Sequence, residues 1–257
     1  RFRNVTGVQT CALPISRIFH SSQLSVNSII SLDDGARRHA IQVLRLKESA
    51  PLTLFDGLGS EFSATISSIE KHSVEVCVVD KHTPLLESPL NIHLFQVISK
   101  GERMDYAVQK ATECGVSEIT PLFSERCVVK LDTKRVEKKI SHWQKIALAT
   151  CEQCGRNKIP TINPAISFKQ MLNNGSTGAK FIFNEKAEHL LSKHPLTQQQ
   201  LTKILMVIGP EGGLSEKEVK GAQSSGWNEV LLGPRVLRSE TAPVVAITTM
   251  QLLWGDL

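Results

Sequence analysis

Two short loops near the end of the chain carry the residues whose types and spacing could do chemistry. The first is IGPEGGL, residues 208–214, directly after the strongest predicted strand. The second is LGPRVLRSETA, residues 232–242, which leads into the last predicted helix. Glycine lets a backbone approach a ligand closely, and proline fixes the path of a loop. Backbone N–H and C=O groups in such loops can pair with the edge of an adenine, although GPEGG alone could equally be only a tight turn.

Other catalytic patterns are weak or missing. The sequence contains no GxxxxGK[ST] phosphate loop and no GxGxxG turn opening a βαβ unit, which weighs against an ATPase and an ordinary Rossmann enzyme. Cys151 and Cys154 form a lone CxxC without further ligands at suitable spacing, so no metal site is predicted. The scattered histidines are interpreted as packing or surface residues, and they include His20, His39, His93, His142 and His194.

Composition sets the class of protein. The 257 residues are 41% hydrophobic and 21% charged, which is enough apolar surface for two modest domains. No apolar run approaches the ~20 residues of a membrane-spanning helix, so no membrane association is predicted. The net charge of +5 permits a polyanionic partner. Six cysteines without a secretory leader pattern predict reduced thiols and a cytoplasmic protein.

The pattern of elements divides the chain at residues 83–90, a proline-containing linker. Residues 1–16 match no targeting signal and are expected to be a non-native leader, outside the fold. Residues 17–86 alternate apolar and polar residues at 52–57, 61–69 and 73–80, which predicts antiparallel strands of a small β-barrel. A helix is expected between Asp33 and Leu46, capped by Asp33 or Asp34.

Residues 90–257 show a different pattern, in which predicted strands alternate with predicted helices. Near-continuous apolar strands are expected at 91–99, 118–123, 180–184, 203–209 and 229–233. Helices are expected at 103–115 and 133–154, and Ser215 with Glu218 predicts a capping box. Strands that alternate with helices and are apolar on both faces predict an α/β domain with a parallel sheet. Ligands bind outside the carboxyl ends of such strands, where both loops lie.

Taken together, these motifs resemble the RsmE family, the 16S ribosomal RNA uracil-N3 methyltransferases of the SPOUT superfamily. The resemblance runs from residue 17 to residue 257. Its elements, in order, are SRIFH (16–20), HAIQVLRL (39–46), LFDG (54–57), SKGERMDYAVQKATECGV (99–116), ITPLFSERC (119–127), WQKIALATCEQCGRNKIP (143–160), IGPEGGLS (208–215) and LGPRVLRSETA (232–242).

The resemblance implies a fold, a donor and partners. It implies an α/β SPOUT domain with a deep trefoil knot and parallel sheet over residues 90–257, and a PUA-like RNA-binding β-barrel over residues 17–86. It implies a homodimer that uses S-adenosyl-L-methionine to form 3-methyluridine in 16S rRNA within the assembled small ribosomal subunit. The residues it assigns to the methyl-donor pocket are Asn184, Gly209, Glu211, Gly212, Gly213, Leu232, Gly233, Leu237 and Arg238.

Catalysis and RNA contact are predicted from side-chain chemistry. Arg238 is the candidate to stabilise charge that develops on the uracil carbonyls. Glu240 could accept the N3 proton or hold Arg238 in place, and the second role is preferred. The candidate RNA contacts are basic residues on both domains, namely Arg17, Arg37, Arg38, Arg45, Lys100, Arg103, Arg126, Lys130 and Arg156. Two alternatives stay open: a knotted methyltransferase acting on tRNA ribose, and a catalytically inactive ribosome-assembly factor.

Overall fold

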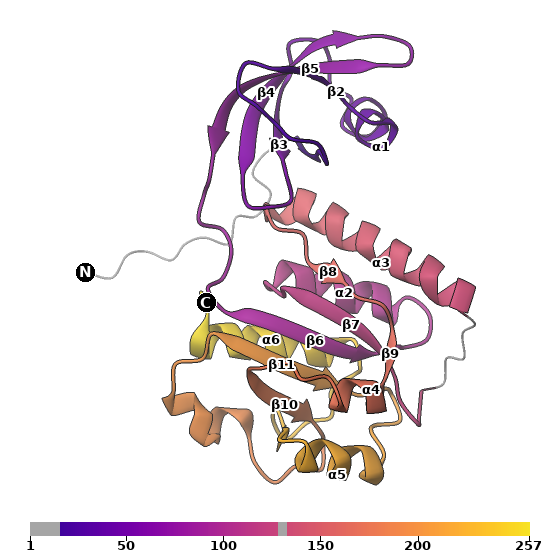
Figure 1. The fold of residues 1–257 in the computed structure, drawn as a ribbon, viewed down its shortest axis with the longest axis vertical. Coiled ribbons are helices and arrows are strands. Elements are labelled where there is room, and N and C mark those ends of the chain that lie inside the picture. Colours follow the sequence, from indigo (N-terminus) through magenta and orange to yellow (C-terminus); the bar gives the residue numbers. More distant parts are fainter. Residues whose placement is uncertain (1–15, 128–132) are drawn as a thin grey trace. The chain divides into compact units, whose positions relative to one another are not determined.

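The computed structural model describes residues 16–127 and 133–257, and the chain divides into two compact units. The smaller unit takes the chain up to Leu86 together with Gly155–Lys158, and the larger takes Glu87–Cys154 and Ile159–Leu257. Figure 1 labels the helices and strands of both units. The Gly155–Lys158 segment belongs to the smaller unit although it lies far along the chain, and Lys158 forms an isolated bridge with Leu58.

The smaller unit is built on a five-stranded sheet in the order β1-β3-β4-β5-β2. The strands are β1 (Arg17–Phe19), β2 (Ile29–Ser31), β3 (Pro51–Phe55), β4 (Glu61–Ile69) and β5 (Val74–His82). The predicted antiparallel pairing is confirmed for β3 with β4 and β4 with β5, and β1 runs parallel to β3. β1 and β2 escape prediction because three residues are too few to show an alternating pattern.

The predicted helix of this unit begins where expected and ends earlier. α1 (Asp34–Arg38) is capped by Asp33, whose carboxylate accepts from the backbone N–H groups of Gly35 and Ala36. The chain continues as one π-helical turn, η1 (His39–Val43). Ala36 and Ala40 are buried in the core of this unit, with Leu54 and Val76 of the sheet. The helical spacing of these alanines therefore marks the face of the helix that packs into the core.

The larger unit contains a parallel sheet in the order β12-β10-β11-β6-β7-β8, with β9 also paired to β7. Its strands are β6 (Asn91–Val97), β7 (Glu118–Phe123), β8 (Thr161–Ile162), β9 (Ile166–Ser167), β10 (Ala179–Phe183), β11 (Lys203–Ile208) and β12 (Asn228–Val230). Every pairing among them is parallel in the part of the chain that the structure describes. The prediction of a parallel α/β domain is confirmed.

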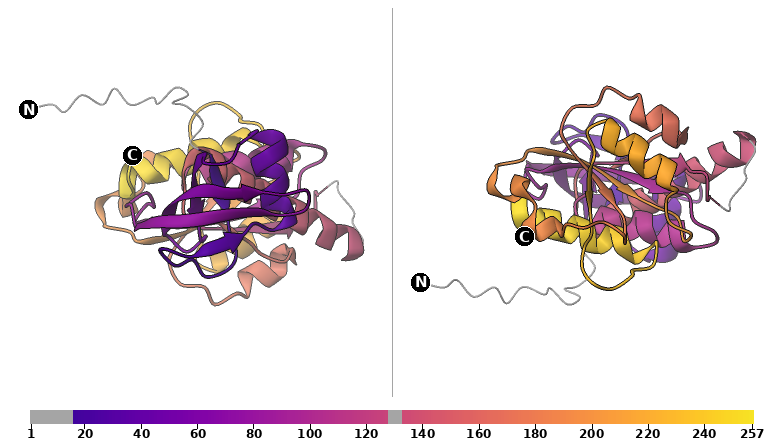
Figure 2. Two further views of the ribbon diagram at one scale, coloured as in Figure 1. Left: turned by 90° about the horizontal axis from the view of Figure 1, so that it is seen from above. Right: turned by 90° about the horizontal axis from the view of Figure 1, so that it is seen from below.

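Helices cover both faces of this sheet. α2 (Arg103–Glu113), α3 (Thr133–Cys154) and α6 (Thr241–Trp254) share one apolar core with the sheet. α4 (Phe168–Leu172) and α5 (Glu216–Ser224) share a second core on the other face, and the short turns η2 (Leu191–Lys193) and η3 (Pro195–Gln198) lie between β10 and β11. Figure 2, seen from below, shows α5 and α6 on opposite sides of the strands. Burial on both faces explains why the strands are apolar without alternation.

The N-terminus of α2 is held by α3. Asp105 in the first turn of α2 accepts from the indole N–H of Trp143 at 2.8 Å, and His142 lies 2.8 Å from its other oxygen. Trp143 itself is 1% exposed. The start of α2 is anchored to the buried Trp143 side chain. The backbone of Arg103, the first residue of α2, is therefore held in place.

Glu218 ties the loop after β11 to the loop after β7. The predicted capping box is confirmed, since Ser215 caps α5 and the Glu218 carboxylate accepts from the Ser215 backbone N–H at 2.9 Å. Its other oxygen accepts from the backbone N–H of Glu125 at 2.9 Å. Glu218 is 7% exposed, so its carboxylate has little access to water and depends on these two donors.

We predict that Glu218→Ala lowers the free energy of unfolding by about 2 kcal/mol, because it leaves two backbone donors without an acceptor. Urea denaturation followed by circular dichroism measures the change. Glu216→Ala is the control, since Glu216 is exposed in the same helical turn and is expected to change the free energy by less than about 0.5 kcal/mol. Equal effects of the two substitutions would contradict the structural role of Glu218.

Candidate functional site

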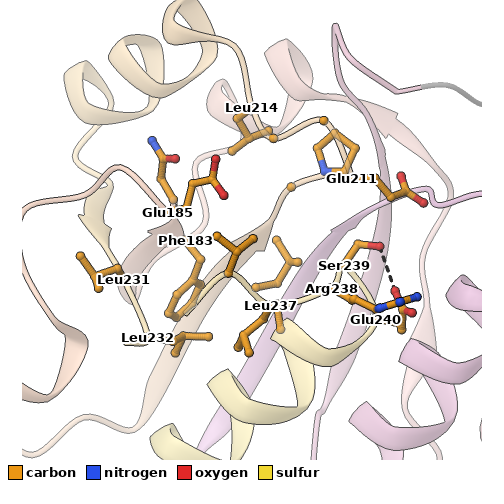
Figure 3. A pocket seen from close by; sticks show the side chains of 18 of the residues that line it. Phe183, Glu185, Glu211, Leu214, Leu231, Leu232, Leu237, Arg238, Ser239 and Glu240 are labelled. Atoms are coloured by element: carbon orange, nitrogen blue, oxygen red, sulfur yellow. Dashed lines mark hydrogen bonds between the residues drawn. The ribbon is translucent and has the colours of Figure 1, made fainter. Parts of the chain in front are cut away.

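A cavity of about 560 Å³ opens where β10, β11 and β12 end at the carboxyl edge of the sheet. Three segments supply most of its lining: residues 183–185 after β10, residues 208–214 after β11, and most of residues 231–242 after β12. Figure 3 shows side chains from these segments converging on the cavity. The volume lies within the range of about 300–1,000 Å³ that is typical of small-molecule sites.

Glycines give the cavity a wall of bare backbone on the side of residues 208–214. A Cβ atom at Gly209 would lie 3.1 Å from Cγ of Leu214, so a side chain there would crowd its neighbour. Gly213 has a φ of +68°, which L side chains rarely adopt, and its N–H donates to the Pro210 carbonyl at 2.9 Å. The loop is therefore a tight turn as well as a ligand wall, and the two interpretations of GPEGG are compatible.

The loop after β12 is fixed at both ends. The Leu231 N–H donates to the His189 carbonyl, and the Leu231 carbonyl accepts from the Leu191 N–H, both at 2.9 Å. At the other end, the Ser239 hydroxyl is buried and lies 3.3 Å from the Ser99 hydroxyl. The N–H of Ala242 donates to the Arg238 carbonyl as α6 begins. The Leu232 and Leu237 side chains line the cavity between these anchors.

Charged groups gather at one side of the cavity. The Arg103 guanidinium donates to the Glu211 carboxylate at 2.6 Å, and its Nε lies 4.0 Å from the Glu240 carboxylate. Glu240 also accepts from the Ser239 hydroxyl at 3.3 Å, a contact drawn in Figure 3. One arginine from α2 thus bridges a carboxylate on each of the two predicted loops.

The environment of Glu211 favours its ionised form. Burial by itself raises the pKa of this carboxyl, but hydrogen bonds from its own N–H, from the Arg103 guanidinium and from the Lys100 backbone lower it. Those hydrogen bonds and the nearby positive charge prevail, so the pKa of Glu211 lies below its ordinary value. The carboxylate therefore keeps its negative charge at neutral pH.

Arg238 has no ion pair within 4.0 Å with any residue in the described ranges, whereas Glu240 pairs with Arg103. That Glu240 holds Arg238 in place stays a prediction. The pairing of Glu240 with Arg103 joins the start of α6 to α2, a long-range contact that sequence spacing does not reveal. Arg238 is exposed and lines the cavity.

All nine residues predicted for the donor pocket line this one cavity, although they come from three separate segments. Asn184 is one of them, but its amide nitrogen already donates to the Glu229 carboxylate at 2.6 Å. Seven further lining residues belong to the two loops identified from the sequence but were given no role there, namely Ile208, Pro210, Leu214, Arg235, Val236, Ser239 and Ala242. Phe183, Glu185 and Leu231 lie outside those loops, and their only sequence signal is adjacency to a predicted site residue or loop.

Two of the predicted RNA contacts are buried in the smaller unit. The Arg17 side chain is 10% exposed and pairs with the Glu61 carboxylate at 2.7 Å. It also donates to the Asn157 side chain and lies over the Phe55 ring. Arg156 is 8% exposed. Because the Arg17 side chain is paired with Glu61 and Asn157 and Arg156 exposes little surface, the structure argues against direct RNA contact by either residue.

The other RNA candidates lie in varied settings. Arg38, Arg45 and Lys100 are exposed, whereas Arg37 pairs with Asp34 at 3.2 Å. Arg126 is exposed and donates to the Gly212 carbonyl at 3.0 Å, so it also supports the loop after β11. Lys130 lies outside the described residues.

The described residues contain no group of three or more potential metal ligands. No helix in the same ranges is both long and apolar enough to cross a membrane. Cys151 is buried and Cys154 is exposed, and neither forms a disulfide with another described cysteine.

Comparison with known proteins agrees with the fold and the site. A family model described as an RNA methyltransferase domain matches residues 86–251, and one described as an RNA methyltransferase PUA domain matches residues 32–78. The parallel sheet, the cavity at its carboxyl edge and these matches define the class: the chain is an RNA methyltransferase.

Individual relatives narrow this class. The ribosomal RNA small subunit methyltransferase E of Buchnera aphidicola is 38% identical over 95% of this chain and 98% of its own, and that of Bacillus subtilis is 32% identical over 85% and 89%. The chain belongs to the ribosomal RNA small subunit methyltransferase E family.

Solved structures include relatives with a bound donor. The Neisseria gonorrhoeae member of this family, bound to S-adenosyl methionine, is 39% identical and superposes with a TM-score of 0.88 over 95% of this chain and 99% of its own. A putative methyltransferase from Legionella pneumophila in complex with the same molecule is 38% identical, with a TM-score of 0.91 over 95% and 100%.

We predict that Arg103→Gln raises the pKa of the Glu211 carboxyl, because it removes both a hydrogen bond and a positive charge from the ionised form. Carbon-detected NMR titration of the side-chain carboxyl measures this pKa. Lys110→Gln is the control: it breaks the ion pair with Glu113 elsewhere on α2 and is expected to leave the Glu211 titration unchanged. An unchanged Glu211 pKa in Arg103→Gln would show that the bridge does not form in solution.

Proposed function

We propose that this chain methylates N3 of one uridine in 16S ribosomal RNA, with S-adenosyl-L-methionine as the methyl donor and the assembled small ribosomal subunit as substrate. The observation that carries the proposal is the single cavity that gathers all nine residues expected to bind the donor. Two similar solved structures hold this same donor, which supports its use here. Such a substrate implies that the enzyme works in the cytoplasm.

The cavity fits the donor chemically. The glycine wall at 209–213 allows backbone groups to reach the adenine edge, and the apolar Leu232 and Leu237 side chains offer a surface for its face. Three carboxylates, Glu185, Glu211 and Glu240, also line the cavity and suit a cationic ligand. When bound, S-adenosyl-L-methionine supplies an electrophilic methyl group on a sulfonium centre.

The protein's own residues must manage charge on the uracil. As the N3 proton leaves, negative charge spreads from N3 onto the two neighbouring carbonyl oxygens, and transfer of the methyl group to N3 then neutralises it. Arg238 is suited to stabilise that charge, because its guanidinium is permanently cationic, offers two donors to adjacent oxygens and lacks an ion-pair partner among the described residues. Its exposed position at the cavity leaves it accessible to the base.

Glu240 is our candidate to accept the N3 proton. The role preferred from the sequence, holding Arg238 in place, remains the alternative. Its carboxylate is 18% exposed and lies beside the Ser239 hydroxyl and the Arg103 guanidinium. In this proposal Arg103 and Ser239 orient the carboxylate, and neither of them touches the base.

The deep trefoil knot is proposed from how the last segment runs past an earlier connection. Leu231 hydrogen-bonds to His189 and Leu191, which belong to the long connection between β10 and β11. At the far end of α6, the Trp254 indole N–H donates to the Gln199 carbonyl of the same connection at 3.0 Å. We infer that residues 231–254 thread through this connection, a rare exception to the rule that chains do not knot.

The smaller unit is proposed as a PUA-like RNA-binding barrel over residues 17–86, with residues 90–257 as the SPOUT domain. Its five-stranded sheet and the match to an RNA methyltransferase PUA domain support this division. The basic residues proposed to contact RNA are now Arg37, Arg38, Arg45, Lys100 and Arg126, together with Lys130 outside the described residues. Arg103, also expected to contact RNA, is instead proposed to orient the site, because it is paired with Glu211 and Glu240.

A homodimer is proposed through the helices α2 and α6. Tyr106 on α2 is 46% exposed and Leu252 on α6 is 69% exposed, although both helices are otherwise packed in the main core. Large apolar side chains left exposed on adjoining helices are typical of a surface that another chain covers. Light scattering measures the molar mass of the protein in solution and therefore distinguishes a dimer from a monomer.

Methyl transfer to small ribosomal subunits that lack the modification tests the proposed function. Radiolabelled S-adenosyl-L-methionine provides the methyl group, and nucleoside analysis identifies the product. A single 3-methyluridine supports the proposal. A methylated ribose in tRNA would favour the alternative enzyme, and donor binding without any transfer, or no donor binding, would favour the assembly factor.

We predict that Arg238→Ala lowers kcat at least about 100-fold while the Kd for S-adenosyl-L-methionine changes less than about threefold, since the guanidinium acts on the uracil and not on the donor. Calorimetry measures the Kd, and single-turnover methylation measures the rate. Lys217→Ala, an exposed cation on α5 outside the cavity, is the control and should match the unsubstituted enzyme. Equal loss of donor binding and turnover would make Arg238 a residue that shapes the donor pocket.

A further inference from the structure

Val236 is an exposed apolar side chain at the rim of the cavity. Its exposed fraction is 76%, whereas Leu232 and Leu237 of the same loop are partly buried. The other strongly exposed large apolar residues in the described ranges lie elsewhere on both units, and Val236 is the one among them that lines the cavity. A single exposed valine is common and needs no explanation by itself. The position of Val236 beside the expected donor site does call for an explanation.

The tip of this loop is held in position although it projects. Leu231 is hydrogen-bonded on both sides of its backbone, and Ser239 is buried against Ser99. Pro234 restricts the backbone just before the tip. The side chains of Arg235 and Val236 are therefore presented at a defined place on the rim.

Positive charge flanks the valine on both sides. Arg235 and Arg238 are exposed, and neither forms an ion pair within 4.0 Å with a residue that the structure describes. Arg103 at the same cavity contrasts with them, because Glu211 and Glu240 surround it. The rim thus presents an apolar side chain between two cations that have no internal partner, which suits a nucleobase flanked by phosphates.

We infer that Val236 packs against the face of the unstacked target nucleobase and that Arg235 pairs with a phosphate beside it. A base can enter a cavity of this kind only after it leaves the RNA stack, and apolar contact with its face offsets part of that loss. The inference rests on the proposed function and adds how the nucleotide is held. It separates the cavity into an inner wall for the donor and an outer rim for the RNA.

Substitutions at Val236 test the contact with the base. Val236→Ala should lower kcat/KM for small subunits by about tenfold, within the range for loss of one base contact. Val236→Leu keeps an apolar side chain and should recover most of that loss. The Kd for S-adenosyl-L-methionine should stay unchanged in both. Leu257→Ala is the matched control, since Leu257 is 65% exposed on the larger unit and does not line the cavity.

The salt dependence of binding tests the contact with phosphate. Each phosphate that a cation neutralises steepens the fall of RNA affinity with salt, so Arg235→Gln should reduce the slope of log Kd against log salt by about one. Lys220→Gln removes one exposed charge on α5 and should leave the slope unchanged. Filter binding of small subunits at several salt concentrations provides the slopes.

Several results would overturn the inference. Unchanged kcat/KM in Val236→Ala, or an unchanged slope in Arg235→Gln, would remove the contact concerned. A parallel loss of donor affinity would make Val236 part of the donor wall, and a change of mass in light scattering would make it a contact between protomers. Failure of the proposed function is distinguishable, because the unsubstituted enzyme would then bind the donor and form no 3-methyluridine.

Discussion

The register of three parallel strands is the constraint on which the site depends. Phe183, the last residue of β10, pairs with Ile208 at the end of β11 and with Val230 at the end of β12. Because these strands end level with one another, the loops that follow them open at one edge, and their backbones can enclose a common ligand. Helices on both faces keep water from the strands, so the hydrogen bonds that maintain this register stay intact.

Residues that do not line the cavity hold its loops in place. Glu218 and Arg126 bind backbone groups of the two loops that follow β7 and β11, through a buried carboxylate and an exposed guanidinium. Such contacts fix a glycine-rich loop that would otherwise have many conformations. Backbone and apolar groups form much of the cavity lining, and Arg103, Glu211 and Glu240 gather at one side of it.

The arginine side chains that line the cavity differ in whether they are ion-paired. Arg103 lies between two carboxylates and acts within the protein, whereas Arg235 and Arg238 have no ion-pair partner in the described parts of the chain. Side chains of the same type therefore serve different purposes, because a paired guanidinium has most of its charge offset. This distinction separates residues that position the site from residues that can meet an anionic substrate.

Local pattern was sufficient for much of this protein. Residues 61–69 and 133–154 form the predicted strand and helix, and Asp33 and Ser215 cap the predicted helices. The family resemblance selected nine residues that line one cavity. These features depend on periodicity, caps and glycine-rich loops, which are determined by residues close together in the sequence. The tertiary structure alone decided that Glu240 pairs with Arg103, that Arg17 and Arg156 are buried, and that Val236 stands exposed. Those outcomes depend on contacts between segments far apart in the chain, whose approach no local pattern encodes.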